Sequence, residues 1–176
     1  MFYELVATLV AGVAAAGVVL ALNQLTGKRL PKWMMPVGAG LGMILVSIAN
    51  EYAWYDRNAG NLPEGLVVAQ TIENSSSYRP WTKVKPYIDR FVAVDVQSIR
   101  IHPEAPERRM VDTLFMGRWA AVNKLTVLAD CDAGRRAALF DTVGFGADGS
   151  VQGAEWVTVP GDDPLLTTIC SAEVPR

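Results

Sequence analysis

The first fifty residues contain two long runs of uncharged, mostly apolar side chains, at residues 5–22 and 33–50. Each run has about 18 residues, and at 1.5 Å per helical residue it would extend roughly 27 Å, close to the hydrocarbon thickness of a bilayer. We therefore predict a transmembrane helical hairpin over residues 1–50, with helices at about 3–25 and 32–52. A polar juxtamembrane linker at 51–65 is expected to lead to an α+β domain at 66–176.

Two other interpretations of the apolar runs are a cleaved signal peptide and a hairpin buried in a soluble core. The first run is preceded by Phe2, Tyr3 and Glu4, so the basic segment that opens a signal peptide is missing there. Burial in a soluble core would require a large protein around two uncharged runs of this length. A membrane hairpin is therefore favoured, and the lipid bilayer is the first predicted partner.

The turn between the runs carries three cations, Lys28, Arg29 and Lys32, and no acidic residue. The positive-inside rule places this turn in the cytoplasm and both chain termini on the opposite side of the membrane. Gly27 suits the end of the first helix, and Pro31 suits the first turn of the second. Aromatic residues expected at the membrane interfaces are Trp33 on the inner side and, on the outer side, Phe2, Tyr3, Tyr52, Trp54 and Tyr55.

Small residues recur at a spacing of four in both runs, at Gly12 and Ala16 and at Gly38 and Gly42. This spacing lets two helix backbones approach closely, so that dispersion forces can drive their association in a membrane. The partner of this small face remains open: the two helices pack on one another, or one face docks on a different membrane protein. Neither run contains an ionisable residue, which argues against an ion path or proton relay in the hairpin.

Beyond the hairpin, alternating apolar and polar positions predict antiparallel strands. The expected strands are residues 66–72, 91–95, 98–102, 110–119, 124–130, 135–141, 142–145 and 151–159, with turns at 132–134 and 148–149. Prolines keep residues 79–86 from forming an internal strand, and residues 103–106 break the strand pattern. Asp163 at a cap position, Pro164 and the apolar residues after it predict a short helix. The simplest assembly is an antiparallel meander closed by this helix.

The charge balance excludes some classes of partner. The chain has a formal net charge of −2, and residues 51–176 carry 13 Lys and Arg against 17 Asp and Glu, which gives −4. This balance does not fit a nucleic-acid-binding protein, and it predicts no basic surface for anionic lipid.

The only two cysteines, Cys131 and Cys170, both lie beyond the hairpin. If that side of the membrane is the periplasm, the compartment favours a disulfide between them. The bridge would close a loop of about 40 residues, which the loop-entropy model values at roughly 4 kcal/mol. A reactive thiol or a metal pair is the alternative, but the chain has no CxxC spacing and its single His102 is distant in sequence. We therefore favour the disulfide and predict neither a metal nor a cofactor.

Other patterns that suggest chemistry have structural explanations. Residues 144–149 match GxGxxG, but the segment after them alternates like a strand, so a Gly-rich hairpin turn is predicted instead of a dinucleotide site. His102 is expected in an exposed loop, and a turn explains Asp130 and Asp132 on either side of Cys131. We therefore assign no catalytic residue and expect no enzyme.

Several short motifs fall between residues 81 and 170: Val94-Asp95 with Ser98-Ile99 shortly after, Asp130-Cys131, Asp148-Gly149, Trp156–Pro160 and Cys170. In these motifs the chain resembles the surface-adhesin protein E family of small bacterial envelope domains. The resemblance implies an antiparallel sheet that carries a C-terminal helix stapled by a disulfide. The name-giving members are outer-membrane lipoproteins that face a host, whereas this chain has a two-helix anchor and no cysteine near its start. Host adhesion and binding residues are therefore not carried over.

Together these features predict a non-catalytic accessory subunit of a larger bacterial inner-membrane complex. The hairpin would dock on that complex by its Gly/Ala face, and the outer domain would cover the periplasmic face of the complex. The alternative is a freestanding envelope module that binds a protein, glycan or small ligand on its sheet face. A large hollow lined by aromatic side chains would favour that alternative.

Overall fold

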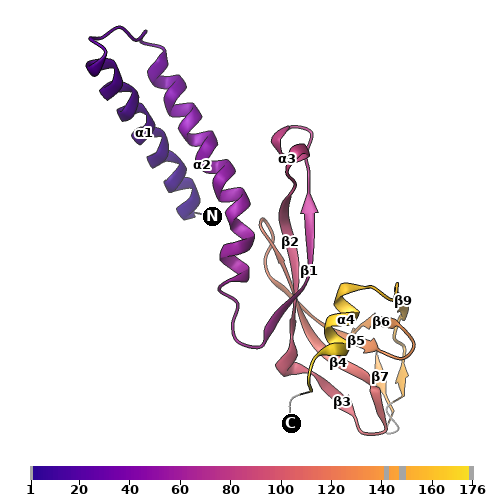
Figure 1. The fold of residues 1–176 in the computed structure, drawn as a ribbon. Helices are drawn as coiled ribbons and strands as arrows, with labels where there is room; N and C mark the ends of the chain where they lie inside the picture. The colour runs from indigo at the N-terminus through magenta and orange to yellow at the C-terminus, as the bar shows by residue number, and fades with distance from the viewer. Residues whose placement is uncertain (1, 141–142, 147–149, 175–176) are drawn as a thin grey trace. The chain divides into compact units, whose positions relative to one another are not determined.

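The computed structural model describes residues 2–140, 143–146 and 150–174, and the chain divides into two compact units, Met1–Asp56 and Arg57–Arg176 (Figure 1). The first unit is an antiparallel pair of helices, α1 (Phe2–Leu25) and α2 (Met34–Ala59). The last turn of α2 belongs to the second unit. Both helices are long and apolar enough to cross a membrane, and only 6% of the apolar window of each is buried. The predicted helical hairpin is confirmed, and its insertion in a bilayer stays a prediction.

The end of α1 depends on two residues with left-handed backbone conformation. Gly27 has φ of +71°, as expected for a glycine at a helix end, and Lys28 has φ of +60°. The Lys28 N–H donates to the Asn23 carbonyl at 2.7 Å, and the Gly27 N–H donates to the Gln24 carbonyl at 3.1 Å. The Asn23 side-chain oxygen accepts from the Leu30 N–H at 3.0 Å. These bonds satisfy carbonyls of the last helical turn and fix the direction in which the chain turns back.

The second helix differs from the prediction at both ends. It begins at Met34, and Pro31 lies in the preceding turn, where its carbonyl accepts the Met34 N–H at 3.0 Å. It continues through the expected linker as far as Ala59 instead of ending near residue 52. Residues 51–59 include charged and polar side chains, but none of them breaks a helix before Gly60. The irregular connection to the first strand is therefore shorter than the predicted linker at 51–65.

The second unit, which we call the outer unit, contains a curled antiparallel sheet with strand order β1-β2-β4-β5-β6-β9, in which β3 also pairs with β4 (Figure 1). A separate pair is formed by β7 and β8. The strands are β1 (Leu66–Asn74), β2 (Tyr87–Asp95), β3 (Arg100–His102), β4 (Ala105–Gly117), β5 (Asn123–Asp130), β6 (Arg135–Ala138), β7 (Gly144–Phe145), β8 (Val151–Gln152) and β9 (Val157–Thr158). The helical segments are α3 (Trp81–Val84), η1 (Val96–Ser98) and α4 (Pro164–Ser171). The predicted meander with a terminal helix is confirmed.

Two strand predictions need correction. Residues 103–106 are expected to interrupt the sheet, yet β4 already begins at Ala105, because Ala105 pairs with His102 on β3. Pro106 precedes the β4–β5 pairing, which starts at Arg108. A proline there removes no hydrogen bond from that pairing. Residues 151–159 form two short strands with different partners, since β8 pairs with β7 and β9 pairs with β6. The expected turn at 148–149 and residues 141–142 lie outside the described residues.

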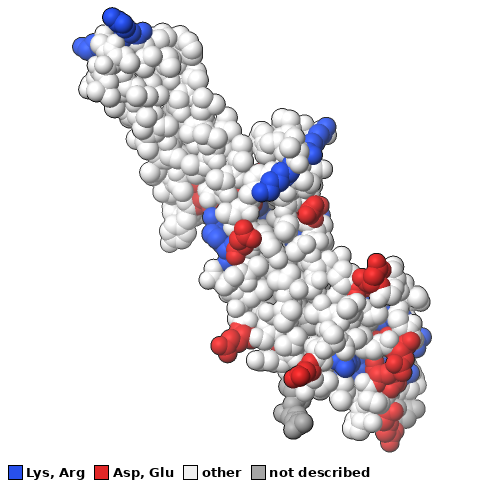
Figure 2. Space-filling view, viewed as in Figure 1, with Lys and Arg blue, Asp and Glu red and all other residues white. Residues whose placement is uncertain are grey.

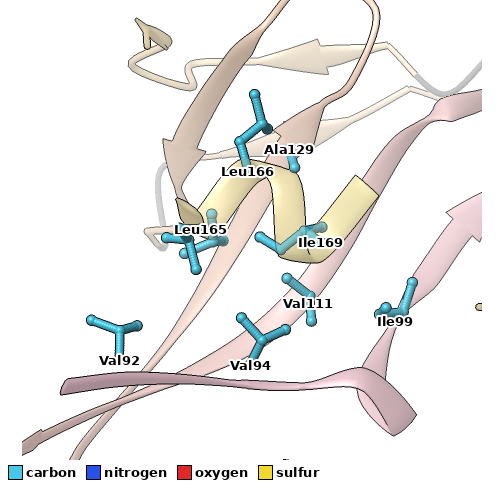
Figure 3. Close-up of a cluster of buried hydrophobic side chains, with 9 residues drawn as sticks. Val92, Val94, Ile99, Val111, Ala129, Leu165, Leu166 and Ile169 are labelled. Atoms are coloured by element: carbon cyan, nitrogen blue, oxygen red, sulfur yellow. The ribbon is translucent and has the colours of Figure 1, made fainter. Parts of the chain in front are cut away.

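The core of the outer unit lies between α4 and one face of the sheet (Figure 3). Leu165, Leu166 and Ile169 occupy one side of α4 because residues three and four positions apart share a helical face. Alternation along the strands directs the facing apolar side chains to the same layer. Those facing residues are Val92, Val94, Ile99, Val111, Val127 and Ala129.

Candidate functional site

The small residues of the hairpin lie at the contact between α1 and α2. A Cβ added at Gly42 would lie 2.6 Å from the Ala15 Cβ and 3.2 Å from the Ala11 carbonyl oxygen. A Cβ added at Gly38 would lie 2.5 Å from a Val19 methyl carbon, and one at Gly12 would meet the Met43 side chain. These glycines therefore serve the packing of α1 against α2, which is the first of the two interpretations. Their surface is already occupied, which corrects the expectation that the Gly/Ala face docks on another protein.

Ala16 completes this face of α1, where it is half-buried beside Ala15. The outward surface of the hairpin has a different character, because a Cβ added at Gly17 or Gly40 would meet nothing within 4 Å. Val13 and Leu45 are among its exposed large apolar side chains. Figure 2 shows this surface as uncharged over most of its visible length, with basic side chains at the turn end.

The aromatic and basic residues of the hairpin gather at its two ends. Because the helix contacts run antiparallel, the start of α1, with Phe2 and Tyr3, lies at the level of residues 52–55 of α2 (Figure 1). Tyr52, Trp54 and Tyr55 are half-buried there. At the opposite end, exposed Trp33 is close in sequence to the basic turn of Lys28, Arg29 and Lys32. Their contact with lipid headgroups stays a prediction.

The predicted disulfide between Cys131 and Cys170 is present. It ties the turn after β5 to the last part of α4, and the Cys131 N–H also donates to the Glu107 carbonyl at 3.1 Å. The two bridged residues are 39 positions apart in sequence. The bridge therefore holds α4 against the sheet by a covalent link as well as by core packing.

Polar groups also fix both ends of α4. The Asp163 side chain accepts from the Leu166 N–H at 2.8 Å, which is the predicted cap. Arg109 donates from one guanidinium nitrogen to the Ile169 and Ala172 carbonyls, at 2.8 and 2.7 Å. A cation at this position also favours the negative end of the helix dipole. Sequence analysis identified the first contact but missed the second, since Arg109 is distant in the chain.

A hollow of about 320 Å³ opens on the sheet face opposite α4, and sequence analysis did not predict it. Its central group is Asp112 on β4, which lies directly across from Thr126 on β5 in the strand register. One Asp112 oxygen accepts the Thr126 hydroxyl at 2.6 Å, and the other lies 2.8 Å from the Lys124 ammonium. The Ser98 hydroxyl oxygen accepts the Asp112 N–H at 2.9 Å. Arg100 also lines the hollow.

The electrostatics of this hollow favour charge recognition over acid–base chemistry. The hydrogen bond from Lys124 is the largest factor that lowers the pKa of Asp112, followed by the hydrogen bond from Thr126. The same contact with Asp112 raises the pKa of Lys124. Both groups are thus held in their charged forms, so neither is poised to exchange a proton near neutral pH. With Arg100 added, the hollow suits a polar or anionic group.

The remaining sequence candidates have structural roles. His102 is the last residue of β3 and is half-buried, so the predicted exposed loop is wrong. Its Nδ1 atom accepts the Glu104 N–H of the following turn at 3.3 Å. Asp130 is buried, and its oxygens accept the Ala133 N–H at 3.1 Å and two guanidinium bonds from Arg135 at 3.0 and 2.8 Å. The predicted turn therefore accounts for Asp130. The described part of the chain contains no group of three or more metal-ligating side chains.

The glycine-rich segment follows the prediction where it is described. Gly144 lies in β7, and β7 pairs with β8 immediately after the GxGxxG pattern. The Gly146 N–H donates to the Ser150 carbonyl at 2.8 Å. A dinucleotide site needs a helix at this point, whereas the chain continues as a strand. Residues 147–149 of the pattern lie outside the described residues.

Comparison with known proteins found no matching family model, curated protein or solved structure. The resemblance to the surface-adhesin protein E family therefore stays a prediction. Function must be argued from the hairpin, the disulfide-closed outer unit and the Asp112 hollow.

A matched pair of alanine substitutions tests the helix contact. Gly42→Ala places a methyl group against Ala15 and the backbone of Ala11, so we expect a loss of about 1–3 kcal/mol in hairpin stability. Gly40→Ala places the same group in open space and should be neutral or slightly stabilising. Thermal unfolding of the full chain in mild detergent, followed by far-UV circular dichroism, measures both variants. Equal melting temperatures for the two variants would contradict the assigned contact.

The second prediction concerns the pH dependence of the Asp112 cluster. NMR titration of the full chain in micelles should give Asp112 a midpoint below its ordinary value of 3.8. Because the folded pKa is lower than the unfolded one, Asp112 stabilises the fold above about pH 4, and this contribution is lost as the pH falls through the folded pKa. Lys124→Met should raise the midpoint, whereas Lys83→Met, at a cation outside the hollow, should leave it unchanged. A wild-type midpoint at or above 3.8 would refute the assignment.

Proposed function

We propose that this chain is a non-catalytic accessory subunit of a larger bacterial inner-membrane complex. The hairpin anchors the chain in the bilayer, and the outer unit covers the periplasmic surface of that complex. The protein acts by its position, because it places a stable folded unit beside a partner that crosses the same membrane.

The observation that carries the proposal is the division of the hairpin surface. Gly12, Gly38 and Gly42 are used between α1 and α2, while large apolar side chains such as Val13 and Leu45 face outward. Exposed apolar surface of this extent is unfavourable in water and requires lipid or another apolar protein surface. The outward surface, rather than the glycine face, is therefore the part of the hairpin that would contact a partner.

The disulfide supports a periplasmic location for the outer unit. Disulfides persist in oxidising compartments such as the periplasm and are rare in the bacterial cytosol. Cys131 and Cys170 both lie in the outer unit, whereas Lys28, Arg29 and Lys32 lie in the turn of the hairpin. The positive-inside rule keeps that basic turn in the cytoplasm. The two arguments are independent, and both support a periplasmic location for the outer unit.

The polar groups of the outer unit favour a structural role. Asp112 is held ionised by Lys124 and Thr126, and Asp130 is engaged by Arg135. The Nδ1 atom of His102 accepts the Glu104 N–H of the turn that follows β3. Groups engaged in this way stabilise strand pairs and turns and are not free for proton transfer. We therefore infer that the protein is not an enzyme.

The second candidate is a freestanding envelope binding module, and the Asp112 hollow favours it. The hollow lies on the exposed sheet face and presents Arg100 and Lys124 beside apolar Met110 and Leu139. A small anionic ligand with an apolar part fits this chemistry. The lining mixes polar and apolar side chains and contains no aromatic one, whereas the sequence predicts an aromatic hollow for a binding module. The accessory-subunit proposal therefore remains first.

Membrane topology provides one prediction. A reporter enzyme that is active only in the periplasm should be active when fused after Arg176 and inactive when inserted in the basic turn. In intact cells, Cys131 and Cys170 should resist thiol alkylation until a reductant is added. Cys131→Ser is the matched control, since it leaves Cys170 free to be alkylated. Free thiols in the wild type, or an inactive reporter at the C-terminus, would overturn the periplasmic assignment.

A second prediction addresses the partner. Photo-cross-linking residues placed at outward Val13 and Leu45 should give a discrete adduct with one integral membrane protein in living cells. The same protein should remain bound in constant ratio after extraction in mild detergent. A cross-linker at Ala15, inside the helix contact, is the control and should give no such adduct. Recovery of the chain alone, with lipid adducts only, would contradict the accessory role and favour the binding module.

A further inference from the structure

The segment that joins β1 to β2 has a composition unlike the rest of the outer unit. This segment, residues 75–86, is called the tip loop below, and it contains α3. It carries Arg79, Lys83 and Lys85 and no acidic residue. Residues 57–176 have 13 Lys and Arg against 15 Asp and Glu, and outside the tip loop the numbers become 10 against 15. The acidic net charge therefore conceals one local basic segment.

Large apolar and aromatic side chains are exposed among these cations. Val84 is 89% exposed, the highest value among the large hydrophobic residues that the structure describes, and Tyr78 is 75% exposed. Trp81, at the start of α3, is also exposed. Figure 2 shows basic side chains over the α3 end of the β1–β2 pair. Exposed apolar groups of this size have a cost in water, so their combination with cations points to a partner surface.

The tip loop is held in a defined conformation. Thr82 is fully buried, and its hydroxyl accepts the Ser76 N–H at 2.9 Å and donates to the Arg79 carbonyl at 2.7 Å. The Lys85 N–H donates to the Trp81 carbonyl at 3.1 Å and closes the turn of α3. These internal bonds fix the backbone of the tip loop before it meets a partner. Binding of its exposed side chains therefore requires little further ordering of the loop.

We propose that the tip loop rests in the headgroup region of an anionic bilayer, as a second membrane contact of the outer unit. Trp and Tyr are favoured at the membrane interface, where one part of the ring is apolar and another is hydrated. Lys and Arg beside them are attracted to anionic phospholipids. This inference departs from the expectation, based on net charge, that the chain has no basic surface for anionic lipid.

The covalent connection to the hairpin favours lipid as the occupant. Residues 60–65 alone separate α2 from β1, so the outer unit stays close to the membrane in which the hairpin is anchored. The nine residues of β1 extend roughly 30 Å, which sets the distance between the end of this short connection and the tip loop. Tethering raises the effective concentration of the tip loop at that surface. The inference thus rests on the proposed membrane anchor.

The test places a fluorophore on the full chain reconstituted in vesicles. The label is attached at Val84→Cys, because Cys131 and Cys170 are joined in the disulfide. Val122→Cys, at another exposed valine of the outer unit, is the matched control. Vesicles contain phosphatidylcholine alone or with phosphatidylglycerol, and quenching by headgroup-labelled lipid reports contact. We expect strong quenching at Val84 with phosphatidylglycerol and weak quenching at Val122.

Charge variants define the cause of the contact. Lys83→Gln should lower the ratio of bound to free tip loop by roughly fivefold, the effect expected for one cation near an anionic surface. Molar salt should also weaken the contact, because it screens exposed charges. Thr82→Val removes the internal hydroxyl bonds of the tip loop. It should therefore make quenching of the Val84 label heterogeneous, even though all three cations remain.

A third label separates failure of this inference from failure of the anchor. A fluorophore at Val13→Cys, on the outward side of α1, should be buried in lipid in both kinds of vesicle if the hairpin spans the bilayer. A lipid-buried Val13 label with a water-exposed Val84 label overturns the tip-loop inference alone. A water-exposed Val13 label overturns the anchor and the inference together. Protection of the Val84 label in native membranes but not in lipid vesicles identifies a protein partner and also overturns the inference.

Discussion

The outer unit depends on the burial of one face of α4 against a single antiparallel sheet. A sheet with one apolar face needs a second layer, and Leu165, Leu166 and Ile169 supply the side chains that cover Val111 and its neighbours. An eight-residue helix has little stability of its own. Its position is therefore reinforced by the Asp163 cap, by Arg109 at its last carbonyls and by the disulfide at Cys170.

The hairpin is stabilised by a different balance of forces. Apolar side chains gain little from leaving lipid for another apolar surface, so close backbone contact must supply the attraction between membrane helices. Gly42 and Gly38 permit that contact because Ala15 and Val19 occupy the space of a missing Cβ. The left-handed backbone at Gly27 and Lys28 then turns the chain back with its terminal carbonyls satisfied. The hairpin contact thus suits the predicted membrane environment, whereas the outer unit depends on a buried apolar core.

The distribution of charge matters more for function than the net charge does. Three cations mark the hairpin turn, three more mark the tip loop, and the Asp112 cluster pairs its charges across two strands. In each of these three places, the side chains around the charged residues determine the role that we assign to them. Apolar runs on either side make the turn a predicted topology signal, and exposed Tyr78 and Val84 make the tip loop a lipid-contact candidate. Lys124 holds Asp112 in its charged form.

The sequence by itself determined the features whose causes are local. Apolar run length predicted the hairpin, Asp163 followed by Pro164 predicted the start of α4, and two distant cysteines suggested one bridge. Tertiary structure alone decided which surfaces meet. The register of β4 on β5 places Asp112 opposite Thr126, α2 packing consumes the glycine face, and the fold of the β1–β2 connection exposes Val84. Periodicity reports which residues share a face, but only long-range pairing fixes what that face contacts.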